Sequence, residues 1–158
     1  MSSARQLSVL IENENQMHEL GIRLGSLLEP GDLVSLNGVL GAGKTTLTKA
    51  IGEGVGVQGS ISSPTFLIAR THSTKSGTPF VHIDAYRLSS PRELDDLDID
   101  YSNSIAVIEW GRGFTDGLSE SILEIEIERF LESEDRKLNI SGQGRLGEVF
   151  ETLGEKKR

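Results

Sequence analysis

The sequence contains no cysteine and few aromatic residues. The absence of cysteine excludes disulfide bonds, thiolate nucleophiles and cysteine-ligated metal sites. Aromatic residues occupy 5% of the 158 positions, so aliphatic side chains must fill most of a buried core. Hydrophobic residues account for 36% and charged residues for 25% of the chain, proportions that are typical of a globular protein rather than a disordered one.

Long apolar runs are also missing. No run approaches the roughly 20 residues of a membrane-spanning helix, and residues 1–16 lack the apolar region of a secretory signal. We therefore expect a cytoplasmic protein without membrane association. The chain length predicts one domain over residues 1–158, with a strand, a helix and a tail over about 131–158.

Positive charge is in the minority. The chain has 16 Lys and Arg against 24 Asp and Glu, which gives a net charge of −8. Proteins that grip nucleic acid alone do so through clustered Lys and Arg, so this balance argues against direct binding through a broad basic face. The acidic run 93–100 is most simply a solvated face, and a partner-docking face is the alternative.

Strand and helix patterns alternate along the chain and favour an α/β fold with a mixed, centrally parallel sheet flanked by helices. Strands are expected at 7–11, 33–37, 65–71, 80–84, 104–110, 122–130 and 136–142. Helices are expected from Asn13 or Asn15 to Leu28, and at 44–53, 90–97 and 145–153. The segment 122–130 alternates apolar and acidic residues, which predicts a strand with one solvated face.

Two of these helices carry boundary signals. Gly54 and Gly56 are expected to end the second helix. Ser90 is the predicted N-cap of the third helix, and Glu93 lies near its third position, as in a capping box.

The strongest motif lies between a predicted strand and a predicted helix. Residues 38–45 read G-V-L-G-A-G-K-T and satisfy the phosphate-loop pattern G-x-x-x-x-G-K-[ST] in full. Glycines allow main-chain N–H groups to converge on phosphate oxygens, and the following helix directs its positive end at the anion. The predicted nucleotide-binding residues are Gly38, Gly41, Ala42, Gly43, Lys44, Thr45 and Thr46.

Within this loop Lys44 is expected to reach the β- and γ-phosphates, and the hydroxyl of Thr45 is expected to coordinate Mg²⁺. The motif alone does not distinguish an ATPase, a GTPase and a kinase. Two acids follow apolar runs, Asp84 after "FVHI" and Glu109 after "IAVI". Either could sit at the carboxyl end of a strand, where open α/β sheets bind ligands, although an ordinary acid at a strand end is the alternative.

Other polar residues allow two interpretations each. Thr65, in "SSPTFL", could direct its hydroxyl toward the γ-phosphate, the metal or the attacking water, or it could belong to a turn before a strand. His82 shares a strand face with Asp84 and could be a core histidine. Arg87 could neutralise charge in the transition state or pair with nearby acids. Trp110 could anchor the core or form a recognition surface.

The motifs "GVLGAGKTT", "SPTF", "HIDAYR" and "IEW", in this order and at these intervals, resemble the TsaE family of small bacterial P-loop ATPases. The resemblance spans about residues 7–130. It implies a P-loop NTPase fold, ATP and Mg²⁺ as cofactors, and a role in threonylcarbamoyladenosine synthesis at position 37 of tRNA. It further implies action through the partner proteins TsaB and TsaD, with ATP hydrolysis supporting their turnover and with only indirect contact to tRNA.

The resemblance also implies roles for individual residues. The implied catalytic residues are Lys44, Thr65, Asp84 and Glu109. The implied metal ligands are Thr45, Asp84 and Glu109. Trp110 matches the family's tryptophan after the second acid. Val39 departs from the pattern, because the family commonly has an acid after the first loop glycine.

Two other functions remain open at the level of sequence. A small-molecule kinase would need an arginine-bearing lid over the phosphates, and no segment rich in arginine stands out. A non-enzymatic nucleotide sensor would use ATP only to order a docking surface. The sequence has no N-K-x-D guanine-reading motif, which favours adenine over guanine.

Overall fold

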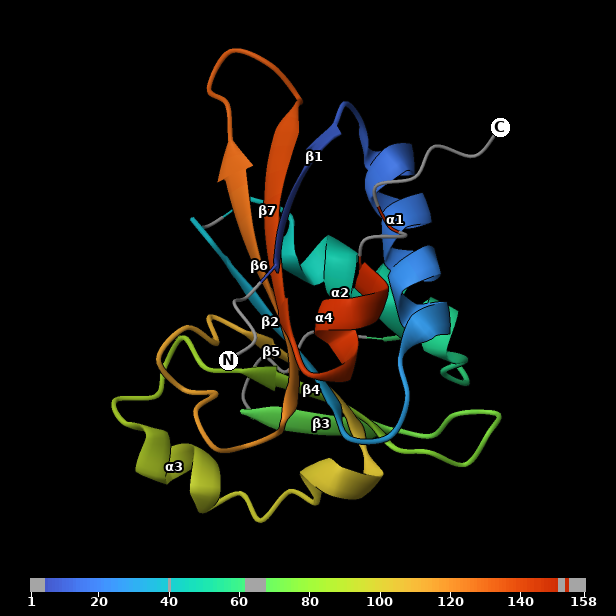
Figure 1. The fold of residues 1–158 in the computed structure, drawn as a ribbon, viewed down its shortest axis with the longest axis vertical. Helices are drawn as coiled ribbons and strands as arrows, with labels where there is room; N and C mark the ends of the chain where they lie inside the picture. Colours follow the sequence, from blue (N-terminus) through green and yellow to red (C-terminus); the bar gives the residue numbers. More distant parts are fainter. Residues whose placement is uncertain (1–4, 40, 62–67, 151–152, 154–158) are drawn as a thin grey trace.

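The computed structural model describes residues 5–39, 41–61, 68–150 and 153. Within these ranges seven strands form one sheet in the order β1-β7-β6-β2-β5-β4-β3 (Figure 1). The strands are β1 (Arg5–Ile11), β2 (Asp32–Gly38), β3 (Ala69–His72), β4 (Phe80–Asp84), β5 (Ile105–Glu109), β6 (Ser121–Arg129) and β7 (Arg136–Gln143). The helices are α1 (Glu14–Leu27), α2 (Lys44–Val55), α3 (Pro91–Asp95), α4 (Arg145–Val149) and a 3-10 helix, η1 (Tyr101–Asn103).

The centre of the sheet is parallel and its outer parts are antiparallel. Strand β2 pairs in parallel with β5 on one side and β6 on the other, and β5 pairs in parallel with β4. The pairs β1–β7, β6–β7 and β3–β4 are antiparallel. The carboxyl ends of β2, β4, β5 and β6 therefore meet at one edge, which confirms the predicted mixed sheet with a parallel centre.

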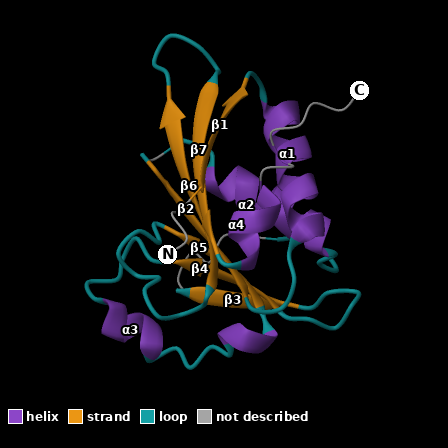
Figure 2. Cartoon of the chain, viewed as in Figure 1, coloured by secondary structure: helices purple, strands orange, loops and turns teal. Residues whose placement is uncertain are grey.

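Hydrophobic cores lie on both faces of this twisted sheet. Helices α1, α2 and α4 lie together on one side (Figure 2), where their apolar residues pack against Leu123, Ile125 and Ile127 of β6. Between them Glu124 and Glu126 are partly buried and Glu128 is exposed, so the predicted solvated face is confirmed. On the other face, Leu33 and Ile108 pack with side chains from the segment 85–118.

Helices α1 and α2 pack closely through glycines, and this explains one error in the sequence prediction. Gly54 does not end α2, which continues to Val55 and is capped by Gly56 in the left-handed conformation. A Cβ at Gly54 would lie 2.3 Å from the carbonyl oxygen of Ile22. The glycine at position 54 thus permits helix contact, whereas the glycine at position 56 ends the helix.

The N-terminus of α3 also differs from the prediction. The side chain of Ser90 caps no amide, although Ser90 occupies the N-cap position with an extended backbone. Glu93 instead accepts hydrogen bonds from the amide (2.7 Å) and hydroxyl (3.1 Å) of Ser89. Helix α3 ends at Asp95, before the predicted end at residue 97, and η1 was not predicted.

Other boundaries agree with the expectations in part. Asn13, rather than Asn15, caps α1 and accepts a hydrogen bond from the amide of Gln16 at 2.9 Å. Helix α4 ends at Val149, before the predicted end at residue 153. Of the strand predicted at 65–71, positions 65–67 lie outside the described residues, and β3 covers the rest.

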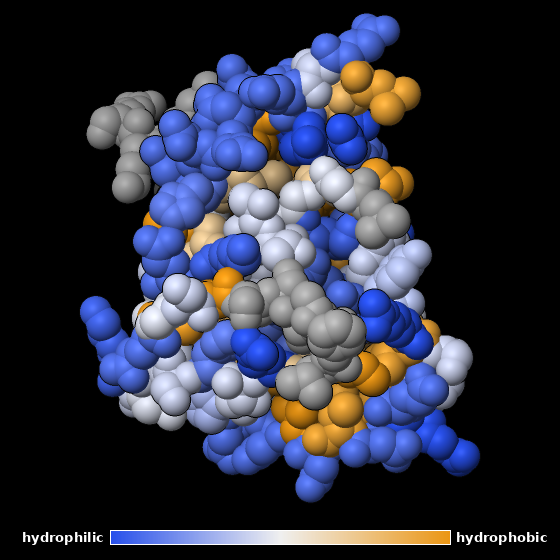
Figure 3. Space-filling view, turned by 180° about the vertical axis from the view of Figure 1, so that it is seen from behind, coloured by the Kyte–Doolittle hydropathy of each residue, from blue (hydrophilic) through white to orange (hydrophobic). Residues whose placement is uncertain are grey.

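The face of the molecule seen in Figure 3 is mostly hydrophilic, with a group of hydrophobic side chains near its lower end and scattered ones elsewhere. Among the described residues the exposed large hydrophobic side chains are Leu10, Val39, Tyr86, Phe130 and Leu131. No helix in the described ranges is long and apolar enough to cross a membrane.

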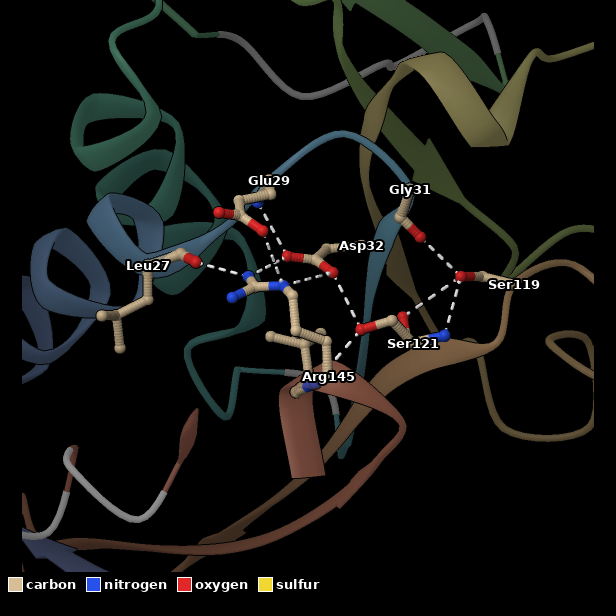
Figure 4. A network of polar contacts seen from close by, with 8 residues as sticks. Leu27, Glu29, Gly31, Asp32, Ser119, Ser121 and Arg145 are labelled. Carbon is tan, nitrogen blue, oxygen red and sulfur yellow. Dashed lines mark hydrogen bonds and ion pairs between the residues drawn. The ribbon is translucent and has the colours of Figure 1, made fainter. Parts of the chain in front are cut away.

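A polar network joins four elements at the amino end of β2 (Figure 4). The carboxylate of Asp32 accepts hydrogen bonds from the hydroxyl of Ser121 (2.8 Å) and the amide of Glu29 (2.7 Å), and it pairs with the guanidinium of Arg145. Arg145 also donates to the carbonyl oxygen of Leu27 at 2.5 Å, which satisfies the end of α1. The hydrogen bonds with Asp32 raise the pKa of Arg145.

Candidate functional site

The phosphate-loop sequence connects β2 to α2 at the carboxyl edge of the sheet. Gly41 and Gly43 have positive φ angles of 79° and 112°, which disfavour other residues. A Cβ at Gly38 would lie 2.7 Å from the carbonyl oxygen of Ile127 on β6. Gly43 is the N-cap of α2 and has no side chain to cap the first amides of the helix. These amides suit an anion such as a phosphate group.

The side chain of Lys44 is fixed by hydrogen bonds to the main chain of this loop. Its side chain is buried, and Nζ donates to the carbonyl oxygens of Gly38 (2.7 Å) and Val39 (2.9 Å). Burial lowers the pKa of Lys44, while the carboxylates of Glu109 and Asp84 act in the opposite direction. The ammonium group is therefore held by two hydrogen bonds and is influenced by three carboxylates, those of Glu109, Asp84 and Glu126.

The two predicted acids lie side by side, because Asp84 and Glu109 are register partners at the ends of β4 and β5. Glu109 is buried, and its Oε1 accepts a hydrogen bond from the hydroxyl of Thr45 at 3.0 Å. Its Oε2 is hydrogen-bonded to Nε2 of His82. Asp84 is partly buried and accepts from the amide of Tyr86 at 3.0 Å. Glu109 is thus the acid that contacts the loop threonine.

These donors have the chemistry that a magnesium site requires. Within the described ranges no group of three or more His, Cys, Asp or Glu side chains could hold a metal ion on its own. Mg²⁺, however, is usually held by one or two carboxylates together with phosphate oxygens and water. The hydroxyl of Thr45 and the carboxylate of Glu109 are hard oxygen donors in direct contact, so they fit Mg²⁺ shared with a nucleotide.

Trp110 packs against the core as the first of its two predicted roles requires, while its role as a recognition surface stays a prediction. It packs against the second core and also lies over Lys44, with Nζ 3.9 Å from the ring centroid. The ring of the exposed Tyr86 lies against it, with centroids 5.0 Å apart. Trp110 adopts a positive φ of 62°, an uncommon conformation for a bulky residue, and its amide donates to the carbonyl oxygen of Leu36 at 2.7 Å.

Two arginines near the loop were missed by the sequence prediction. A Cβ at Gly41 would lie 2.9 Å from Nη1 of Arg129, so this guanidinium lies against the loop. Nε of Arg136 donates to the carbonyl oxygen of Ala42 at 3.1 Å. The two arginines face each other across the β6–β7 pair. No local signal marks them, since only the position of β6 beside β2 brings them to the loop.

A cavity of about 200 Å³ opens beside the phosphate loop. Gly41, Ala42, Gly43 and Thr46 form one wall. Polar groups on the other walls come from the start of α1 and from the β6–β7 hairpin, and they include Asn13, Glu14, Glu134 and Arg136. The cavity is therefore continuous with the loop and is lined by both hydrogen-bonding and apolar groups.

The structure brings nearly all of the predicted site residues to one edge of the sheet. They are Gly38, Gly41, Ala42, Gly43, Lys44, Thr45, Thr46, Asp84 and Glu109. Thr65 lies outside the described residues, so its predicted role stays a prediction. Arg87 is exposed after the end of β4.

Comparison with known proteins identifies the family. The protein-family model described as "Threonylcarbamoyl adenosine biosynthesis protein TsaE" matches residues 11–138 of this chain. This chain belongs to the TsaE family. A TsaE of Streptomyces coelicolor is 51% identical over 135 residues, covering 81% of this chain and 91% of the relative. A TsaE of Bacillus subtilis is 30% identical over 149 residues, covering 92% of each chain.

A solved structure agrees with this assignment. The crystal structure of Bacillus subtilis YdiB superposes with a TM-score of 0.73 at 27% sequence identity, and the match covers 97% of each chain. Membership of the TsaE family and the α/β fold predicted from the sequence are therefore both confirmed.

Proposed function

We propose that this protein is an ATPase that supports threonylcarbamoyladenosine modification of tRNA. Its membership of the TsaE family supports a role in this biosynthesis. The proposal of ATP hydrolysis is carried by the contact between Thr45, in the phosphate loop, and Glu109, at the end of the adjacent parallel strand. This pairing is the arrangement that a magnesium-dependent nucleotide hydrolase needs.

The residues divide the chemistry among them. Lys44 and the loop amides would hold the β- and γ-phosphates and balance the charge that grows on them during transfer to water. Thr45 and Glu109 would hold Mg²⁺, which when bound neutralises phosphate charge. Asp84, beside Glu109, would orient the water that attacks the γ-phosphorus while the bond to the leaving oxygen breaks. Thr65, in the switch-like segment predicted from the sequence, would direct its hydroxyl toward the γ-phosphate, the metal or the attacking water.

The cavity beside the loop provides a place for the nucleotide base. Its volume of about 200 Å³ suits a purine, and it adjoins the loop where the phosphates would lie. Asn13 and Glu134 place an amide and a carboxylate on its walls, groups that can pair with the polar edge of adenine. The absence of a guanine-reading motif supports ATP as the nucleotide.

The proposed partners are TsaB and TsaD. Slow turnover by the protein alone, raised by these partners, is expected because neither arginine at the loop is poised as a catalytic cation. The side chain of Arg129 is exposed, and Arg136 donates to the carbonyl oxygen of Ala42. The net charge of −8 supports contact with tRNA through the complex rather than by this chain alone. We place this activity in the cytoplasm.

The proposal is tested by measuring phosphate release and tRNA modification in a reconstituted system. ATP hydrolysis should rise when TsaB and TsaD are added, and Lys44→Ala should abolish both hydrolysis and multiple-turnover modification. Lys49→Ala is the matched control, because Lys49 is an exposed lysine of the same helix. Equal hydrolysis with and without partners, or full modification with Lys44→Ala, would overturn the proposal.

A further inference from the structure

His82 is a fully buried histidine in the middle of β4. Its exposed fraction is 0%, and its Nε2 is hydrogen-bonded to Oε2 of Glu109. The other ring nitrogen, Nδ1, is also buried and has no hydrogen-bond partner among the described residues. A buried imidazole in this position lowers the stability of the fold relative to an aliphatic residue, because one of its polar atoms has no hydrogen-bond partner among the described residues.

The contact has a defined direction. An ionised carboxylate only accepts hydrogen bonds, so Nε2 of His82 carries the hydrogen and donates it to Glu109. In the neutral form Nδ1 is then an acceptor without a hydrogen. His82 and Glu109 lie on the face of the sheet that carries Phe80 and Val107, both members of the core under α1, α2 and α4. Thr45, in α2, approaches Glu109 from this side.

The two oxygens of Glu109 therefore have different partners. Oε1 accepts from Thr45, the residue expected to bind Mg²⁺ through the same hydroxyl, and Oε2 accepts from His82. A metal ion would use lone pairs of the Thr45 hydroxyl and of Oε1, so both atoms of this hydrogen bond would be shared with the metal. The bond to His82 can persist, because its donor is a buried side chain that is not among the proposed metal ligands.

We propose that His82 is the positioning residue for Glu109. It fixes Oε2 and thereby presents Oε1 to the magnesium ion and to Thr45. Histidine holds the carboxylate here in the way that outer-shell partners hold ligands in metal sites. This inference rests on the proposed function, since it assigns His82 a role in the same magnesium-dependent reaction.

The experiment compares two amide substitutions in the full chain. In His82→Gln the side-chain nitrogen occupies nearly the position of Nε2 and can still donate to Glu109. In His82→Asn the nitrogen lies near the position of Nδ1 and cannot reach it. His72→Asn makes the same chemical change on β3 and is the matched control, because His72 is a partly buried histidine that, like His82, has one buried ring nitrogen without a hydrogen-bond partner among the described residues.

The measurements are ATP binding in EDTA, the Mg²⁺ concentration for half-maximal hydrolysis, and kcat and KM. For His82→Asn we expect ATP binding in EDTA to stay within about 2-fold, and the Mg²⁺ requirement to rise about 10- to 100-fold, as for other outer-shell partners. A lower kcat should accompany this change. His82→Gln should restore both values most of the way to those of the wild-type protein.

The outcomes separate the inference from the proposed function. If wild-type protein shows no Mg²⁺-dependent hydrolysis, the proposed function fails and this inference falls with it. If the wild-type protein is active and His82→Asn matches it, only the role of His82 is overturned. If Asn and Gln variants lose ATP binding in EDTA and thermal stability equally, His82 is a packing residue and the inference is again wrong.

Discussion

Each end of β2 has an acidic and a basic side chain nearby, but the two pairs serve different purposes. At the amino end, Asp32 and Arg145 satisfy one another and neighbouring main-chain groups in a network that joins α1, β2, β6 and α4. At the carboxyl end, Nζ of Lys44 donates to two loop carbonyl oxygens and lies over the ring of Trp110, while the carboxylate of Glu109 contacts Thr45.

This difference distinguishes a structural network from a binding site. Groups that satisfy one another across several elements stabilise the fold and leave no capacity for a ligand. At the other end Lys44 and Glu109 form no ion pair with each other within the described ranges, and Gly41 and Gly43 add no side chain of their own to the loop. The site can therefore exchange its contacts for those of a phosphate group and a metal ion.

Among the changes that test the comparison of the two ends of β2, the largest effect should come from Glu109→Gln at the carboxyl end. This change keeps the shape of the side chain and removes its charge. We expect ATP hydrolysis to fall about 10²- to 10³-fold, which is typical for loss of one group that stabilises transition-state charge. Binding of ATP in EDTA should remain. Glu19→Gln, at an exposed position of α1, is the control. Full hydrolysis by Glu109→Gln would contradict the assignment of this acid.

Asp32→Ala should give the next largest effect, on stability rather than on catalysis. The change leaves Arg145 without its buried partner. Loss of one member of a buried pair costs about 3–5 kcal/mol, and partial exposure of Arg145 reduces this to about 2–3 kcal/mol. Denaturant unfolding measures the loss, and Asp96→Ala, at an exposed position in the segment after α3, is the control. If Asp32→Ala unfolds like the wild-type protein but binds ATP more weakly, the assignment of Asp32 to a purely structural network is wrong.

Arg129→Ala should have a smaller effect, confined to the site. The guanidinium lies against Gly41, so its loss should lower kcat/KM for ATP about 10-fold through weaker charge stabilisation near the phosphates. Thermal unfolding should not change, because the side chain is exposed. Arg92→Ala, in α3, provides an exposed arginine as control. An unchanged kcat/KM would remove Arg129 from the site.

The smallest effect concerns the pH dependence of folding stability, at the amino end of β2. Burial raises the pKa of Tyr101, beside the amino end of β2, to about 12 from 10.0. The unfolded chain therefore releases the phenol proton first as pH rises, so this stabilising contribution is complete below about pH 10 and is lost toward pH 12. Tyr101→Phe should flatten the fall of the unfolding midpoint over this interval. Tyr86→Phe is the control, since Tyr86 is exposed. Identical pH profiles for Tyr101→Phe and the wild-type protein would refute this assignment.

Much of the candidate site could be predicted from the sequence, because its strongest signal is local. The phosphate loop requires glycine at fixed intervals, and the conformations of Gly41 and Gly43 bear out that requirement. The apolar and acidic alternation of β6 likewise predicted its buried and solvated faces. The spacing could not show that Glu109, rather than Asp84, contacts Thr45, since that depends on the way α2 packs on the sheet.

Local sequence also misled where one residue type serves two purposes. Gly54 has the signature of a helix end, but it lies within α2 because α1 passes too close for a side chain. Ser90 has the signature of a cap, but the neighbouring Ser89 makes the bond to Glu93. In both cases a contact made in the folded chain decided between conformations that the local sequence allowed.

The sequence by itself determined the order of the elements, the faces of the strands and the conformation of the loop, since each depends on residues close together in the chain. Only the tertiary structure decided which side chains surround that loop. Strand β6 lies beside β2, and this brings Arg129 and Arg136 to a loop that precedes them by about 90 residues. Strand order and register depend on pairing and burial across the whole sheet, which no short segment encodes.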